Sequence, residues 1–252
     1  MKSLIVTVAG TATRFNRDTT EETLKCLYHI GNPKNSLLYQ ILDKARDIDE
    51  YIIVGGYLFD KLSRFAESYL IEFLPKIKLV YNPEYSTFGS GFSLIKGIEA
   101  LSPETQEVIF VEGDLFFDEK DFEAVKSCNK NVCTVNHDLI TARKAVVVYE
   151  TVLGKLRYLY DTSHKYLEIE EPFLSIYNSG QIWKFTNRNK LTAILASLSR
   201  KQTEGTNLEI IQGYFGDLEP DEYRMIPLKT WFNCNTVDDY KQVYSIISHE
   251  NA

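Results

Sequence analysis

Apolar runs and amphipathic segments alternate along the first half of the chain. Continuous apolar and β-branched residues predict four buried strands, at residues 4–8, 51–57, 77–82 and 107–114. Between them, apolar residues recur at helical spacing in three segments, residues 36–46, 60–73 and 91–101. Ser36 is a suitable N-cap for the first of these helices. Strands that alternate with helices in this way predict an α/β fold, a Rossmann-like and mostly parallel sheet with helices on both faces.

The second half of the chain has a different pattern. Residues 130–138, 144–162 and 173–185 alternate as paired strands do, and Leu153-Gly154-Lys155 is typical of a hairpin turn. Helices are predicted at 189–201 and at 236–250, the second with Thr236 as its N-cap. Because no repeat or linker composition interrupts the chain, we predict a single domain over residues 1–252 with a mixed-sheet C-terminal extension.

Composition narrows the class of partner. The chain has 252 residues, of which 44% are hydrophobic and 25% are charged, values that are ordinary for a soluble protein with one sizeable core. The formal net charge of −7 argues against nucleic acid as a partner, because a phosphate backbone requires a basic face. A small anionic ligand remains compatible with this charge, since a local pocket can be basic on an acidic protein.

The four cysteines have no CxxC spacing and no histidine partners at zinc-finger spacing. We therefore expect reduced thiols in a cytoplasmic protein and no zinc site. The sequence opens directly on a strand-like run with no visible signal peptide, and no apolar stretch approaches the roughly 20 residues of a membrane span. The pattern is compatible with a monomer or an oligomer.

The first candidate for chemistry is the loop after the first strand. Five small residues form it: Ala9, Gly10, Thr11, Ala12 and Thr13. Ligands of open α/β sheets bind at the carboxyl ends of strands, and successive backbone N–H groups of small residues can surround an anion. Arg14 can add a bidentate contact, and a second cation at Lys25 favours a polyphosphate. The alternative is a tight turn with a solvated arginine; neither a Walker A nor a GxGxxG sequence is present.

The segment "TVAGTATRF…LKCL" resembles the signature of the nucleotidyltransferase superfamily with the glycosyltransferase-A-like fold, in which A-G-x-G-x-R follows a strand and a lysine motif comes later. Four further segments occur in the family's order and extend the resemblance over nearly the whole chain: residues 81–97, 111–117, 177–185 and 231–240. "YNPEYSTFGSGFSLIKG" at 81–97 is most similar to phosphocholine cytidylyltransferases. "WFNCNTVDDY" at 231–240 is similar to the family's terminal D-x-N/D-T element.

The resemblance implies a fold of the nucleotide-diphospho-sugar transferase type, with a nucleotide-binding half (1–127) and an acceptor-binding half (128–252). It also implies transfer of a nucleoside monophosphate, with CTP as the favoured donor, to a small phosphorylated or phosphonate acceptor such as a phosphocholine-like compound. Arg14 and Lys25 would then be catalytic, and Mg²⁺ would be held by Asp114 and Asn235, or by Asn233 in place of Asn235.

The remaining implied site residues divide between donor and acceptor. The loop Ala9–Thr13 would hold the triphosphate, and Ser90 and Gly91 would lie near the base or ribose. Asn178, Ser179 and Gly180 would face the acceptor.

The chain departs from the family pattern at four positions. Ala12 replaces the second glycine; if that residue has a positive φ, alanine costs about 1–2 kcal/mol. Cys26 stands where proline or alanine is common, and Glu112 and Asn233 stand where aspartate is common. The geometry of the metal site is therefore less well specified by the resemblance than the fold.

Each candidate residue also has a purely structural interpretation. Lys25 could be a surface lysine, Asp114 could end a strand in a turn, and Asn235 could belong only to a helix cap. Tyr177 and Trp183 are more typical of core aromatics than of a cage for a choline-like cation.

Three other function classes stay open. They are a sugar-1-phosphate nucleotidyltransferase using UTP, dTTP or GTP, a non-catalytic nucleotide-binding domain, and a glycosyltransferase. Glu112-Gly113-Asp114 only partly matches the Asp-x-Asp motif of the last class.

Overall fold

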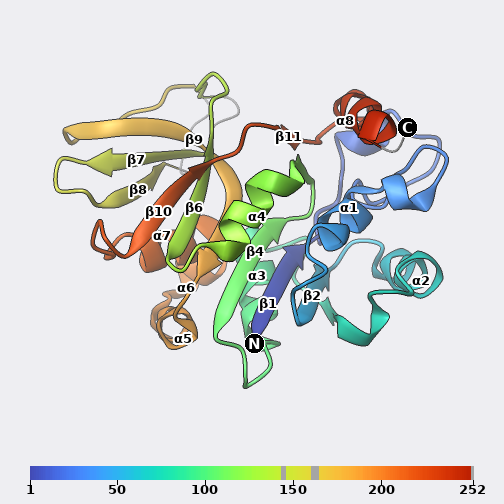
Figure 1. The fold of residues 1–252 in the computed structure, drawn as a ribbon, viewed down its shortest axis with the longest axis horizontal. Helices are drawn as coiled ribbons and strands as arrows, with labels where there is room; N and C mark the ends of the chain where they lie inside the picture. Colours follow the sequence, from blue (N-terminus) through green and yellow to red (C-terminus); the bar gives the residue numbers. More distant parts are fainter. Residues whose placement is uncertain (143–145, 160–164, 251–252) are drawn as a thin grey trace.

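A central sheet organises the computed structural model, which describes residues 1–142, 146–159 and 165–250 (Figure 1). Its main path of strands runs in the order β10-β6-β9-β4-β1-β2-β3. The first four strands in the chain are β1 (Lys2–Thr7), β2 (Glu50–Gly55), β3 (Ile77–Tyr81) and β4 (Glu107–Glu112). These four pair in parallel, so their carboxyl ends lie at one edge of the sheet. The predicted α/β class with a mostly parallel first half is confirmed.

The rest of the sheet is mixed, as predicted. The strands here are β6 (Asn131–Asn136), β7 (Val147–Thr151), β8 (Leu156–Leu159), β9 (Phe173–Phe185) and β10 (Tyr223–Pro227). The long strand β9 runs antiparallel to both β4 and β6, and β7 and β8 form a hairpin on its outer part. Gly154 in the hairpin turn has a φ of 72°, which a glycine adopts without strain. Both predicted halves contribute strands to this one sheet, and the division at residue 127 stays a prediction.

Helices cover both faces of the sheet, as predicted. One face is covered by α1 (Leu37–Asp43), α2 (Phe59–Tyr69) and α4 (Glu119–Ser127), and the other by α3 (Ser90–Glu99), α5 (Arg188–Ser197) and α7 (Asn207–Phe215). Side chains alternate along β1, so Leu4 and Val6 enter one core while Ile5 enters the other. A strand that is buried on both faces explains the unbroken apolar run in the sequence.

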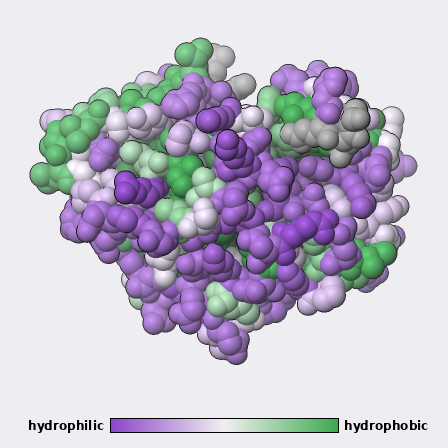
Figure 2. Space-filling view, in the orientation of Figure 1, coloured by the Kyte–Doolittle hydropathy of each residue, from purple (hydrophilic) through white to green (hydrophobic). Residues whose placement is uncertain are grey.

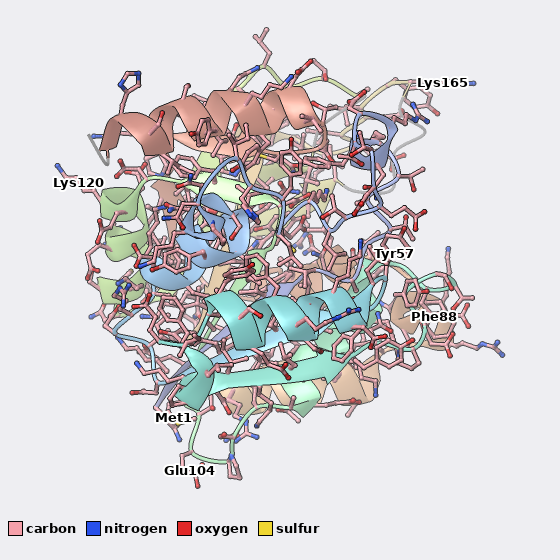
Figure 3. The ribbon with its side chains drawn as sticks, turned by 90° about the vertical axis from the view of Figure 1, so that its right-hand side faces the viewer. Met1, Tyr57, Phe88, Glu104, Lys120 and Lys165 are labelled. Atoms are coloured by element: carbon pink, nitrogen blue, oxygen red, sulfur yellow. The ribbon has the colours of Figure 1, made fainter. Side chains whose placement is uncertain are left out.

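A third apolar cluster joins the two ends of the chain. Helix α8 (Val237–Glu250) packs Tyr240 against Tyr28, whose ring in turn meets Phe15 with centroids 5.2 Å apart. The hydroxyl of Tyr240 donates to the carbonyl of Asn35 over 3.0 Å. Helix α8 therefore lies beside the N-terminal segment in space (Figure 1) and across the top of Figure 3. This cluster holds the segment that contains Arg14 and Lys25 against helix α8.

Short elements complete the chain: the 3₁₀ turns Phe15–Arg17, Pro33–Asn35 and Leu74–Lys76, the helix α6 (Arg200–Thr203), and the strands β5 (Leu115–Phe117) and β11 (Trp231–Asn233). The strands β5 and β11 form a separate antiparallel pair. All four cysteines are free. Among the described residues, no helix is long and apolar enough to cross a membrane. Exposed apolar side chains, including Val152, Leu153 and Leu174, gather at the outer end of the β7–β9 strands (Figure 2).

Several local expectations are confirmed and one is wrong. Ser36 accepts a bond from the amide of Tyr39, and Thr236 accepts one from the amide of Asp239. The single helix predicted at 189–201 is instead two helices, because Ser199 forms a capping box with Gln202 that starts α6 afresh. The sequence pattern also missed α4, α7 and β10.

Gly113, directly after β4, lies in a tightly packed place where a side chain would not fit. An added Cβ there would lie 2.3 Å from Cγ1 of Val8 and 2.9 Å from the carbonyl oxygen of Thr7, whereas one at Gly10 would meet nothing within 4 Å. We predict that Gly113→Ala lowers the free energy of unfolding by about 1–3 kcal/mol, the cost of overpacking. Gly10→Ala should change it by less than about 0.5 kcal/mol. Urea unfolding of both variants measures this; equal effects would contradict the described packing.

Candidate functional site

A pocket of about 240 Å³ opens at the carboxyl edge of the parallel strands. Its walls come from the loops that follow β1, β3 and β4 and from the segment around Lys25. The residues most relevant to chemistry along it are Ala9, Gly10, Lys25, Ser90, Glu112 and Asp114. This is the edge at which open α/β sheets bind ligands. Sequence-predicted residues from four separate segments therefore meet at one pocket.

The loop after β1 is held in an unusual backbone conformation. The carbonyl of Ala9 accepts a bond from the amide of Tyr57 over 3.2 Å, which ties the loop to the end of β2. Ala12, which stands where the family has its second glycine, has a φ of 50°. It therefore occupies the left-handed region, at a cost of about 1–2 kcal/mol. Ala9 and Gly10 line the pocket, and the hydroxyls of Thr11 and Thr13 contact each other over 3.0 Å at the exposed part of the loop.

Four polar side chains converge beside this loop. The ammonium of Lys25 lies 2.5 Å from Oδ2 of Asp114 and 3.3 Å from Oδ1 of Asn235. The guanidinium of Arg14 donates to the same Oδ1 over 2.8 Å. The side chains of Lys25 and Asp114 are 25% and 15% exposed, so their ion pair is only partly screened by water. The structure thus brings together all four residues that the sequence predicted as catalytic or metal-binding.

The C-terminal segment holds Asn235 in place. The amide of Cys234 donates to the carbonyl of Asp114 over 2.8 Å, and β11 pairs with β5 directly after Asp114. Asp239 accepts bonds from the amides of Asn235 and Thr236 and caps the start of α8. The structural interpretation is therefore correct for Thr236, which is the cap, while the side chain of Asn235 is free to contact Arg14 and Lys25.

Glu112 also lies in the pocket, at a position that the sequence marked as a departure from the family and as part of a partial Asp-x-Asp match. It lies on the pocket wall, where it accepts bonds from Nδ2 of Asn207 at 2.7 Å and Nε2 of Gln181 at 3.3 Å. Burial, followed by the nearby charge of Asp114, raises the pKa of Glu112 to about 7. Sequence reasoning missed Gln181 and Asn207 entirely. Only the closeness of Gln181 to the predicted acceptor residues could have indicated it.

Ser90 and Gly91, which were predicted together, lie in different surroundings. Ser90 lines the pocket, and its hydroxyl accepts the amide of Asn207 over 3.1 Å. Gly91 donates its amide to the carbonyl of Gly205 over 3.1 Å, and a Cβ there would lie 2.7 Å from the carbonyl oxygen of Thr206. Gly91 is therefore needed for the close approach of α3 to the 205–206 segment. A contact of Gly91 with a nucleotide stays a prediction.

The predicted acceptor residues form an irregular part of β9. Asn178 donates to the carbonyl of Asp138 over 2.6 Å, the amide of Ser179 donates to the carbonyl of Val146, and Gly180 accepts from the indole of Trp231. All three are buried, and these polar groups are used within the fold. Their contact with an acceptor stays a prediction.

Trp183 is completely buried and stacks on Phe110 with centroids 5.3 Å apart. The interpretation as a core aromatic is correct for it.

Aromatic rings form another wall of the pocket. Tyr85 and Phe88 both line it, and the ring of Tyr57 lies 6.5 Å from that of Tyr85. Tyr57 and Phe88 lie on the same side of the molecule (Figure 3). Rings of this kind offer flat faces on which a nucleobase can stack. Cys26 also lines the pocket, but burial raises the pKa of its thiol to about 12, so the thiol is protonated and a poor nucleophile.

The donor atoms suit Mg²⁺ better than a softer metal. Asp114 offers a carboxylate and Asn235 an amide oxygen, both turned toward Lys25, and Glu112 lies on the same wall. Mg²⁺ binds hard oxygen atoms and usually takes only one or two protein carboxylates. Within the described part of the chain, no three His, Cys, Asp or Glu side chains form a ready cage, so phosphate oxygens and water would complete the coordination. These residues therefore fit the predicted ion.

Solved structures share this fold. The inositol-1-phosphate CTP transferase from T. maritima matches with a TM-score of 0.70 and 15% identity, over 98% of this chain and 95% of that one. A putative glucose-1-phosphate thymidylyltransferase from Bacillus anthracis, solved with sucrose, matches with a TM-score of 0.68 and 14% identity over the same shares. The predicted nucleotidyltransferase fold is confirmed; identities this low show the fold alone.

The sequence comparisons add the family. A search of curated proteins finds no match. One family model matches residues 21–247, which include Lys25, Glu112, Asp114 and Asn235. The chain, with its nucleotidyltransferase fold, belongs to the family described as a domain of unknown function (DUF6564).

Proposed function

We propose that this protein transfers a nucleoside monophosphate, with CMP from CTP as the favoured group, to a small phosphorylated or phosphonate acceptor. The observation that carries the proposal is the convergence of Arg14, Lys25, Asp114 and Asn235 at one edge of the pocket. Two cations, a carboxylate and an amide oxygen around one point match the needs of a polyphosphate and its metal ion. Although Arg14 is exposed, its guanidinium is directed to the same amide oxygen as the ammonium of Lys25.

The donor triphosphate would lie along the loop Ala9–Thr13. The exposed amides of this loop and the guanidinium of Arg14 would bind its β- and γ-phosphate oxygens. Its base would enter the pocket between Ser90 and the aromatic wall of Tyr85 and Phe88. The strained φ of Ala12 supports this arrangement, because a non-glycine residue in that region is commonly kept for a functional geometry.

The reaction requires alignment and charge neutralisation more than covalent help from the protein. An oxygen of the acceptor phosphate forms a bond to the α-phosphorus of the triphosphate, and the bond from that phosphorus to the bridging oxygen breaks. Pyrophosphate leaves with the bonding electrons. Lys25 would neutralise charge that develops at the α-phosphate. Asp114 and Asn235 would hold Mg²⁺, which would supply further positive charge toward the phosphate oxygens.

The choice of CTP rests on residues 81–97. This segment is similar to that of phosphocholine cytidylyltransferases and, in the fold, forms the pocket wall that includes Asn82, Tyr85 and Ser90. A solved protein of similar fold is named as a CTP transferase. A sugar-1-phosphate nucleotidyltransferase is the second candidate, because a thymidylyltransferase matches the fold almost equally well.

The first prediction concerns the nucleotide. With Mg²⁺ present, CTP should raise the melting temperature more than ATP, GTP, UTP or dTTP at equal concentration, since a ligand of the native state stabilises it by mass action. Differential scanning fluorimetry measures the five shifts. A larger shift with UTP or dTTP would favour the sugar-1-phosphate class, and no shift with any nucleotide would reject the proposed donor site.

The second prediction concerns the two cations. Arg14→Ala and Lys25→Ala should each lower kcat by at least about 100-fold, which is typical of removing a preorganised charge that stabilises the transition state. Arg17→Ala is the matched control, because Arg17 is another exposed arginine only three residues away. Release of pyrophosphate is the readout. Near-normal turnover of either site variant would remove that residue from the mechanism.

The third prediction concerns the metal ligands. Asp114→Asn should abolish nearly all activity because it removes the anionic ligand, whereas Asn235→Ala should lose less because it removes a neutral one. Titration of Mg²⁺ against pyrophosphate release compares them, and an excess of chelator should stop the parent protein. Full activity of Asp114→Asn, or of the parent in chelator, would show that the reaction uses no metal at this place.

A further inference from the structure

Three side-chain amides connect Glu112 to the cations of the site. Nε2 of Gln181 donates to Glu112 over 3.3 Å, and Oε1 of Gln181 accepts from Nδ2 of Asn233 over 2.9 Å. Oδ1 of Asn233 accepts from Nδ2 of Asn235 over 2.6 Å. Oδ1 of Asn235 then accepts from Arg14 and Lys25. The chain of bonds starts at the end of β4, passes through residues of β9 and of the C-terminal segment, and ends at Arg14 and Lys25.

The two ends of this chain dictate its direction. An ionised carboxylate can only accept hydrogen bonds, and lysine and arginine can only donate them. Three amides placed between such ends have one arrangement in which every bond is made, with each nitrogen turned toward Glu112 and each oxygen toward the cations. Reversing any one amide would bring two nitrogens or two oxygens face to face. The observed bonds follow that one arrangement.

The backbone supports the central member of the chain. Cys133 pairs with Trp183 and Val135 pairs with Ser179, so a step of two residues on β6 spans four residues on β9. Gln181 lies within this bulge, is buried, and has a φ of 57°. Residues other than glycine rarely hold such a φ unless the surroundings enforce it. The bulge therefore turns a buried glutamine toward Glu112 and Asn233, where regular pairing would not place it.

We propose that Gln181 is a positioning residue of the nucleotidyl-transfer site. Together with Asn233 it forms a polarised relay of hydrogen bonds that begins at Glu112. This relay orients the amide oxygen of Asn235 toward Arg14, Lys25 and the proposed nucleotide and metal. This inference rests on the proposed function for the identity of the ligand. The relay itself is a property of the fold and can be tested without a ligand. It assigns a role to a glutamine in the segment 177–185, next to the predicted acceptor residues Asn178, Ser179 and Gly180.

The relay predicts a rescue by exchange. Gln181→Glu alone places two carboxylates face to face, and Glu112→Gln alone removes the end that sets the direction. The double variant, Glu112→Gln with Gln181→Glu, keeps shape and net charge, and the residue at 181 again accepts from Asn233. A role of Gln181 in packing alone would predict no such rescue.

The experiment measures binding of CTP with Mg²⁺ by calorimetry, in buffer of about pH 8, which lies above the raised pKa of Glu112. We expect Gln181→Leu to weaken binding by about 10-fold, the loss of roughly one charge-oriented hydrogen bond. The exchange variant should return to within about 3-fold of the parent, while each single exchange stays weaker. Gln212→Leu is the control, because it is the same substitution at a glutamine that bonds the backbone of Tyr158 and Leu156 and lies outside the relay.

Double-mutant cycles separate failure of the inference from failure of the proposed function. In an Asn235→Ala background, Gln181→Leu should have little further effect on binding. The double variant should also lose less melting temperature than the sum of the losses of the two single variants. An undiminished effect of Gln181→Leu in that background, or affinity near that of the parent for Gln181→Leu alone, would overturn the relay. If the parent binds no nucleotide, the proposed function fails, and additive losses of melting temperature would still overturn the relay.

Discussion

The pairing of β11 with β5 is the constraint on which the site depends. It carries the C-terminal segment across the end of β4, where the amide of Cys234 bonds the carbonyl of Asp114. Helix α8 follows at once and packs on Tyr28 and Phe15, next to the loop with Arg14. Residues more than 200 positions apart in the chain thereby contact one another, as Arg14 and Asn235 do. Without this crossing, Arg14 with its loop and the amide oxygen of Asn235 would not meet.

The charges of the site are balanced before any ligand binds. Lys25 and Arg14 face Asp114 and the oxygen of Asn235, and Glu112 adds a second acid whose pKa is raised by burial and by Asp114. Partial burial of Lys25, Asp114 and Glu112 makes their interactions stronger than those of exposed pairs. A triphosphate with its metal ion brings charges of both signs, so it can replace the internal pairing without leaving a buried charge alone. On the proposed function, such an arrangement would need little reorganisation when the triphosphate binds.

Much of the fold could be predicted because local patterns agree with the final structure. The apolar runs of β1, β2 and β4 are buried on both faces, and Ser36 and Thr236 cap helices where the sequence places them. The meeting of Arg14, Lys25, Asp114 and Asn235 could also be expected, because strand ends share one edge and the family resemblance orders the segments.

The rest depends on tertiary context that the pattern does not encode. The bulge that turns Gln181 inward arises from a register shift between β6 and β9, which no periodicity reports. Asn207 begins α7, a helix that the pattern missed, and reaches Glu112 because Gly89 and Gly91 allow α3 to approach the 204–206 segment closely. The predicted helix at 189–201 divides because the side chain of Ser199 accepts a bond from the amide of Gln202 and so caps a new helix. A register shift, a close backbone approach and a helix cap thus override the local preference in these three places.

The most direct test of the account is the location of the nucleotide on the protein. Backbone amide resonances of the labelled protein, followed by NMR during titration with CTP and Mg²⁺, report which segments contact it. The account predicts that the largest shifts fall at residues 9–14, 24–26, 82–91 and 112–114, the loops of the carboxyl edge. Shifts concentrated at the opposite edge of the sheet, around residues 103–106 and 186–190, would contradict it.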